Sequence, residues 1–244
     1  MTRKQRGRPR TGATGEPNEE QTREPLDRGR LIRAALALLD EVGLDGLSMR
    51  RLAERLDVKA ASLYWHVQSK EELLDLLADA ISGEVPAPPP DLPWRPRLEA
   101  LAWQYRRVLL SHRDAARILS ATLPGRPNRL RLVDVTLGAL LDGGFAGLDA
   151  ARAGRLMNDY VVAFVLDEAN QMTIARRYGA GSEVDLDPFA AVPLAQYPSI
   201  AALASHAADP DADERFRFGL TILFDGLARH LARASRPPRS EPQP

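Results

Sequence analysis

The stretch from Ser48 to Lys70 carries the side chains best suited to chemistry, and the chemistry that they fit is DNA binding. A helix that enters a major groove by its N-terminal end needs short side chains where its backbone meets the base edges. A methyl group can contact thymine, a hydroxyl can donate or accept, a lysine can reach guanine, and phenol, imidazole and ammonium groups suit phosphates. We expect base contacts from Lys59, Ala60, Ala61 and Ser62, and phosphate contacts from Tyr64, His66 and Lys70.

Two short helices joined by a tight turn must position these side chains. Ser48 is a good N-cap for the first helix, because its hydroxyl can accept a free N–H of the first turn. The turn at 57–59 leads into the second helix, which we expect over 59–66. Ser69 then caps a third helix, and Glu72 completes a capping box three residues later. The pattern is that of a helix-turn-helix unit.

From about Leu26 to Ile81 the chain closely resembles the DNA-binding domain of TetR-family transcriptional regulators, and in particular the tetracycline-repressor branch. Two runs carry the resemblance: SLYWHV at 62–67 with Lys70, and AALALLDEVGLDGLSMRRLAERL at 34–56. The second run is similar to that branch almost position for position.

The resemblance implies roles for several of these residues. By it, Arg50 reads a guanine and Ser48 contacts a phosphate. The residues that match the family's other phosphate and base contacts are Tyr64, Trp65, His66 and Lys70. The residues that depart from the branch, which has Glu-Gln-Pro there, are Lys59, Ala60 and Ala61, so we expect a different operator sequence.

The composition narrows the class of protein. The formal net charge is zero, but the stretch from Ser48 to Lys70 holds five basic residues against two acidic ones, so positive charge is concentrated there. No cysteine is present, which removes disulfides and thiolate zinc sites. No stretch reaches the roughly 18 unbroken apolar residues of a membrane span. We therefore expect a soluble, cytoplasmic protein without a membrane partner.

The hydrophobic spacing predicts an all-α fold in two domains, with no strand period long enough for a sheet. The expected domains are a disordered basic N-terminal arm (1–25), a three-helix helix-turn-helix domain (26–84), a helical-bundle ligand-binding and dimerisation domain (92–234) and a disordered tail (235–244). The prolines at 86–90 mark the boundary as a stiff joint. In the arm, RGRPR at 6–10 resembles the core of an AT-hook, although a solvated basic tail is an equal alternative.

In the second domain we expect helices over 94–111, 114–122, 128–141, 149–178, 199–206 and 211–234, with a loop over 179–196. Asp149 is the expected cap of the long helix. The helix over 128–141 shows an apolar stripe of Leu130, Val133, Leu137 and Leu140. The helices over 150–178 and 211–234 have apolar stripes wide enough for a homodimer interface, and the resemblance implies a four-helix bundle made from this pair.

The resemblance also implies that the second domain binds a small molecule. The expected ligand-binding residues are Leu101, Tyr105, Leu119, Thr122, Leu123, Thr136 and Tyr160. Three of them are leucines where the tetracycline repressor has its ligand-binding asparagine, histidine and arginine: Leu101, Leu119 and Leu123. We therefore expect a more apolar effector than magnesium-bound tetracycline, with no cofactor and no metal.

The function predicted from these features is a ligand-responsive transcriptional regulator. Its most favoured form is a repressor, released from a palindromic double-stranded DNA operator when a small, largely apolar effector binds. Three alternatives stay open. The helix-turn-helix segment could be a small core in which Tyr64 and Trp65 are packed, the chain could be a non-specific architectural DNA-binding protein, or it could be an enzyme. The last has least support, because the histidines lack metal-ligand spacing and no nucleophile motif is present.

Overall fold

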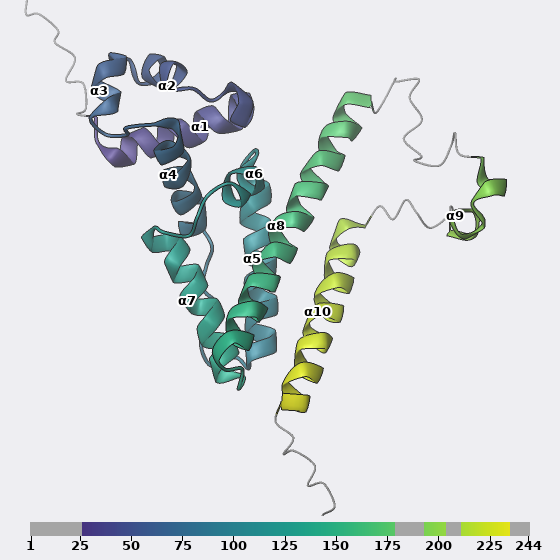
Figure 1. Cartoon of the computed structure of the whole chain (residues 1–244). Helices are drawn as coiled ribbons and strands as arrows, with labels where there is room; N and C mark the ends of the chain where they lie inside the picture. Colours follow the sequence, from purple (N-terminus) through teal and green to yellow (C-terminus); the bar gives the residue numbers. More distant parts are fainter. Residues whose placement is uncertain (1–25, 179–192, 204–210, 235–244) are drawn as a thin grey trace, which may run out of the picture.

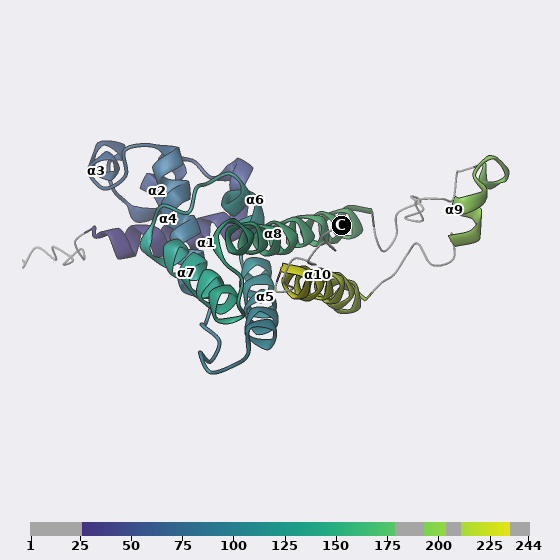
Figure 2. The ribbon, with the colours of Figure 1, turned by 60° about the horizontal axis from the view of Figure 1, so that its bottom comes forward.

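The chain folds into helices alone wherever the structure, a computed structural model, describes it: residues 26–178, 193–203 and 211–234. This confirms the all-α fold class. The helices are α1 (Arg28–Gly46), α2 (Met49–Leu56), α3 (Ala60–Tyr64), α4 (Lys70–Gly83), α5 (Trp94–Ser111), α6 (Ala115–Ser120), α7 (Pro127–Asp142), α8 (Gly147–Tyr178), α9 (Pro198–Leu203) and α10 (Ala212–Ala234). Figure 1 and Figure 2 show α1, α2 and α3 together at one end, and α8 and α10 side by side. Among the described residues, no helix has the length and apolarity of a membrane span.

Serine side chains begin α2 and α4, as the sequence predicts. Ser48 Oγ accepts the N–H of Arg51 at 3.3 Å, and Ser69 Oγ accepts the N–H of Glu72 at 3.2 Å. The Glu72 carboxylate accepts the N–H of Gln68 at 2.8 Å, one residue before the cap. These bonds satisfy N–H groups that have no partner inside the helix, so they fix where each helix starts.

Helix α3 is held against the core by one face only. Leu63 and Val67 are fully buried beneath it. Asp57 makes the tight turn before the helix in a left-handed conformation, with φ of 53°, which Asp tolerates better than most residues. The helix spans Ala60–Tyr64 and is shorter than predicted, since the residues after Tyr64 form a turn.

Helix α4 connects the helix-turn-helix unit to the C-terminal helices. Its Asp79 carboxylate accepts the N–H groups of Asn128 at 2.8 Å and of Arg129 at 3.2 Å, both in the first turn of α7. Arg131 of α7 donates to the carbonyl of Ser82 at the end of α4, at 3.2 Å, and to that of Val85 just after the helix, at 2.9 Å. The prolines at 86–90 are therefore not the sole connection, and one hydrophobic core runs through both halves.

A second bridge joins α1 to the segment between α5 and α6. His112 lies between two carboxylates, with Nδ1 3.4 Å from Asp40 of α1 and Nε2 3.0 Å from Glu84 after α4. Asp114 accepts the N–H of Leu44 at 2.8 Å. Both ends of the helix-turn-helix unit are thus bonded to the helices behind it.

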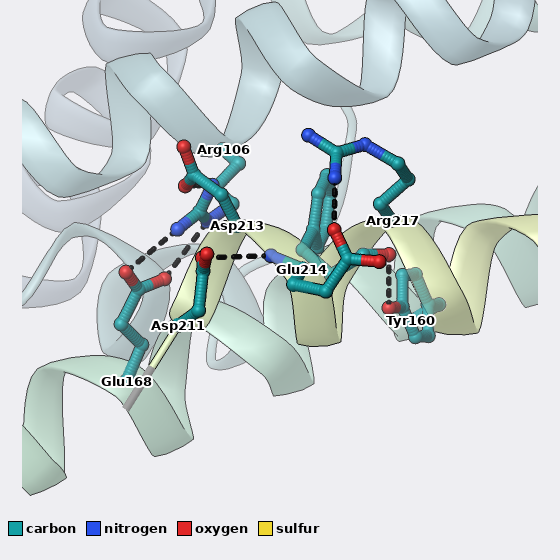
Figure 3. A network of polar contacts seen from close by, with 8 residues as sticks. Arg106, Tyr160, Glu168, Asp211, Asp213, Glu214 and Arg217 are labelled. Carbon is teal, nitrogen blue, oxygen red and sulfur yellow. Dashed lines mark hydrogen bonds and ion pairs between the residues drawn. The ribbon is translucent and has the colours of Figure 1, made fainter. Parts of the chain in front are cut away.

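A buried ion cluster ties α10 to α5 and α8 (Figure 3). Arg106 donates to both carboxylate oxygens of Glu168 at 2.8 Å and to Asp213 at 2.7 Å. Arg106 and Glu168 are buried, whereas the Asp213 side chain is 64% exposed. The Arg106 guanidinium also lies over the ring of Phe216, 5.0 Å from its centroid. A two-bond fork of this kind fixes the orientation of the helices that carry it.

Two expected helices differ from those observed, and other expected segments lie outside the described residues. The long helix begins at Gly147, so the capping role predicted for Asp149 is wrong; its carboxylate instead lies 3.0 Å from His230 Nε2 of α10. The helix predicted over 199–206 is observed as Pro198–Leu203. The parts of our predictions that fall outside the described residues are 1–25, 179–192, 204–206 and 235–244.

Candidate DNA-binding surface and effector cavity

Helix α3 and its flanking turns present the predicted base-reading residues to solvent. Lys59, Ala60, Ala61 and Ser62 are all exposed. Tyr64 is 50% exposed and Trp65 is 90% exposed. The alternative in which these two rings are packed in a core therefore does not hold. The helix has an anchored inner face and a bare outer face, as insertion into a groove requires.

The residues predicted to contact phosphate or guanine surround α3 but differ in freedom. The Arg50 side chain is 84% exposed, and its Nε lies 3.5 Å from Glu54. A surface pair of this kind is weak and can give way to DNA. His66 and Lys70 are half-buried. The Ser48 hydroxyl already accepts one hydrogen bond as a helix cap, so it reaches phosphate only as a donor.

Two other basic residues of this stretch serve the fold. Arg51 donates to the carbonyl of Gly46 at 3.0 Å. Arg55 forms a two-bond fork with Glu41, at 2.6 and 2.7 Å, and this raises the pKa of the guanidinium and lowers the pKa of the carboxyl. Fewer basic side chains are therefore available to contact DNA than the count from the sequence suggests.

A cavity of about 650 Å³ lies behind the helix-turn-helix unit, and side chains from α4 to α8 line it. Six of the predicted ligand-binding residues line it: Leu101, Tyr105, Leu119, Thr122, Leu123 and Thr136. Leu123 is 85% exposed and marks the open side, whereas Leu101 and Leu119 are buried. Volume and lining are those of a site for a drug-sized, mostly apolar molecule.

Tyr160 is the predicted ligand-binding residue that the structure places elsewhere. Its hydroxyl donates to the Phe216 carbonyl at 2.8 Å, and its ring stacks on the Phe216 ring with centroids 5.5 Å apart. The side chain therefore packs against α10 (Figure 3). Tyr160 is not among the residues that line the cavity. An aromatic residue on α8 can face either the cavity or α10, and the spacing of Tyr160 in the sequence does not decide between them.

Sequence reasoning missed Arg129, which lines the cavity and is 8% exposed. It missed this residue because the predicted stripe was built from apolar side chains alone, although Val133 and Leu137 of that stripe line the cavity beside Arg129. Leu130 and Val133 are 51% and 40% exposed, whereas Arg129 and Thr136 are buried. Positions 129, 132, 136 and 140 share one helical face. A search for helical spacing that allowed polar residues as well as apolar ones could therefore have found Arg129.

The buried polar side chains of the cavity lining are Ser82, Tyr105, Arg129 and Thr136, whereas Ser120, Arg155 and Asp159 of the lining are exposed. Burial raises the pKa of the Tyr105 phenol to about 12, so it stays a neutral donor at physiological pH. The nearby Arg129 guanidinium acts in the opposite direction, with the smaller effect. Among the described residues no cluster of three or more His, Asp or Glu side chains could hold a metal.

A helix-turn-helix unit with a bare recognition surface, bonded to a helical domain with an internal cavity, defines a ligand-responsive DNA-binding regulator. The family model for "Bacterial regulatory proteins, tetR family" matches residues 31–77, and that for "Tetracyclin repressor-like, C-terminal domain" matches residues 85–231. The chain belongs to the tetR family. It is a transcriptional regulator and not an enzyme.

Three relatives illustrate the range of the family. The class A tetracycline repressor from transposon 1721 of Escherichia coli is 38% identical over 84% of this chain and 91% of its own. ActR of Streptomyces coelicolor, solved with actinorhodin, has a TM-score of 0.75 and 34% identity over 87% of this chain and 100% of its own. BioQ, from Mycobacterium smegmatis, solved with its double-stranded DNA operator, has a TM-score of 0.63 and 30% identity over 84% and 99%.

Proposed function

We propose that the chain is a cytoplasmic, homodimeric repressor that binds a palindromic operator and is released by a small, largely apolar effector. The observation that carries this proposal is the set of hydrogen bonds between α7, which lines the cavity, and α4 of the DNA-binding unit. Helix α7 lines the cavity, and its first turn is held by Asp79 of α4. A molecule that fills the cavity and moves α7 therefore moves α4, and with it the spacing of the two recognition helices in a dimer.

Exposed apolar side chains on α8 and α10 support the dimer. Leu156 is 51% exposed, Phe218 is 68% exposed and Ile222 is 59% exposed. Large apolar side chains that gather on neighbouring helices mark an association surface. Two copies are also what recognition requires, because one short helix reads few base pairs and half-sites about 34 Å apart double the sequence that is read.

On the DNA, we propose that the residues at the start of α3, together with Arg50 of α2, read bases, and that their neighbours bind phosphates and fix the register. The base-reading set is Arg50, Lys59, Ala60, Ala61 and Ser62, and the phosphate-binding set is Ser48, Tyr64, Trp65, His66 and Lys70. The exposure of α3 supports these roles. Phosphate contacts supply affinity that falls with salt, whereas base contacts supply specificity.

The lining of the cavity supports an apolar effector other than magnesium-bound tetracycline. The lining leucines offer no ligand for a metal: Leu101, Leu119 and Leu123. A relative, ActR, was solved with actinorhodin, and another is a tetracycline repressor. We infer a polycyclic, mostly apolar molecule for this chain as well.

A binding selection on random double-stranded DNA tests this function, with wild type beside Tyr64→Ala. Wild type is expected to enrich a palindrome and the variant is expected to lose it. Tyr197→Ala is the matched control, because Tyr197 is similarly exposed, at 47%, and lies outside the helix-turn-helix unit. Retention of DNA without any enriched sequence would contradict the repressor and favour an architectural protein.

A further inference from the structure

Arg129 is a buried cation whose charge no acid balances. Its Nη1 donates to the carbonyl of Thr122 at 3.2 Å and to the Thr122 hydroxyl at 2.5 Å, and its Nη2 donates to the carbonyl of Leu119 at 3.4 Å. All these acceptors are neutral. Among the residues that the structure describes, no carboxylate oxygen lies within 4.0 Å of the guanidinium, although the side chain is only 8% exposed.

The acids nearest the cavity are already engaged. Asp159 lines the cavity, but both of its carboxylate oxygens accept from Arg155 Nε, each at 2.9 Å. Asp79 is engaged by the backbone N–H groups of Asn128 and Arg129. Burial of a charge without a counter-charge is costly, and most buried arginines in proteins are paired. The Arg129 site is therefore short of one negative charge.

Tyr105 supplies a second free polar group in the same cavity. Its side chain is 7% exposed, and its hydroxyl makes no hydrogen bond to any residue that the structure describes. Its pKa of about 12 keeps the hydroxyl protonated, so it offers a donor. A guanidinium and a phenol O–H together form a pair of donors that suits one anionic oxygen group.

We propose that the effector is an anion: an apolar, fused-ring molecule with a single carboxylate or acidic enol that pairs with Arg129 and accepts a hydrogen bond from Tyr105. This inference rests on the proposed function, because it assigns the chemistry of the effector of that same cavity. Half of the other lining residues are leucine, valine or alanine, and this apolar part of the wall suits the fused rings. The anion supplies the negative charge that the folded chain lacks.

Arg129 also couples the anion to the switch. Arg129 lines the cavity, and its backbone N–H is bonded to Asp79 of α4 at 3.2 Å. An anion that draws the guanidinium away from Thr122 and Leu119 shifts the first turn of α7. The same residue then transmits the shift to α4 and the recognition helix.

The test uses the full chain and two probes of the same shape, anthraquinone-2-carboxylate and the neutral anthraquinone-2-carboxamide, with each affinity measured by calorimetry. Wild type is expected to bind the carboxylate at least about tenfold more tightly, because hydrogen bonds to charged groups are stronger than neutral ones. Arg129→Gln is expected to lose this preference, and Arg129→Lys to keep part of it. The matched control is Arg152→Gln, which removes an arginine of α8 that is paired with Asp149 at 3.8 Å and is not part of the cavity lining, and it is expected to keep the preference.

Three results would overturn the proposal: equal affinity of wild type for both probes, binding of neither at millimolar concentration, or an unchanged preference in Arg129→Gln. None of them depends on DNA. Failure of the proposed function shows separately, as the absence of an enriched palindrome in the selection on random DNA. Enrichment of the wild-type operator by Arg129→Gln also establishes that the variant is folded.

Discussion

Arg106 and Arg129 are equally buried, at 6% and 8% exposed, but their surroundings balance their charge in opposite ways. Arg106 meets two carboxylates from two other helices, Glu168 of α8 and Asp213 of α10. Arg129 meets only carbonyl and hydroxyl oxygens, and it borders a cavity.

A structural charge and a binding charge can be told apart by these surroundings. A buried pair adds little over apolar residues of the same shape, but it fixes one arrangement and is costly to break. It therefore suits the place where α10 must be held against α5 and α8. A buried charge without a partner suits a place where the partner arrives from solution. Substitutions at each arginine test this contrast.

The largest effect is expected from Arg106→Met. It leaves Glu168 buried without a counter-charge, so we expect a loss of about 3–5 kcal/mol in the free energy of unfolding. Urea denaturation followed by circular dichroism measures it. The double variant Arg106→Met with Glu168→Met is the control, and it should recover most of the loss, because no charge is then left unpaired. A single variant as stable as wild type would show that the pair holds nothing in place.

A smaller effect is expected from Tyr105→Phe. It removes one donor from the proposed anion, so affinity for anthraquinone-2-carboxylate should fall about tenfold while affinity for the carboxamide changes less. Tyr160→Phe is the matched control, since its hydroxyl donates to the Phe216 carbonyl outside the cavity. Calorimetry distinguishes the two. Equal losses in both variants would place the ligand nearer α10 than the cavity.

The smallest effect is expected on the stability of Arg129→Gln. No buried carboxylate loses its partner, and removal of an unbalanced buried charge offsets the hydrogen bonds lost at Thr122 and Leu119, so the free energy of unfolding should change by about 1 kcal/mol or less. The same urea denaturation provides the value. A loss as large as that of Arg106→Met would mean that Arg129 is a structural residue, and the contrast between the two arginines would fail.

The helix-turn-helix unit could be predicted in detail because its signals are local. Ser48 and Ser69 cap helices through side chains three residues from their partners, so a short stretch of sequence contains the whole interaction. The exposure of α3 follows from its two buried anchors, Leu63 and Val67. Local spacing was enough here.

The cavity could be predicted only in part, because its walls come from helices far apart in the sequence. Leucines such as Leu101 and Leu119 were found through a resemblance. Tyr160 was misplaced, since its partner Phe216 lies more than fifty positions away and no periodicity links them. Arg129 was missed because a charged residue falls outside an apolar pattern, and its burial depends on the contacts that Asp79 and Arg131 make between α4 and α7.

The most direct measurement of the link between cavity and DNA is the affinity for the selected operator with and without saturating anthraquinone-2-carboxylate, by fluorescence anisotropy. The wild-type affinity is expected to fall by at least about tenfold, and by linkage the operator should weaken probe binding by the same factor. Asp79→Asn should show a smaller fall, because it weakens the bonds between α4 and α7, whereas Asp75→Asn on the same helix should behave as wild type. An unchanged operator affinity in wild type with the probe bound would contradict the proposed switch.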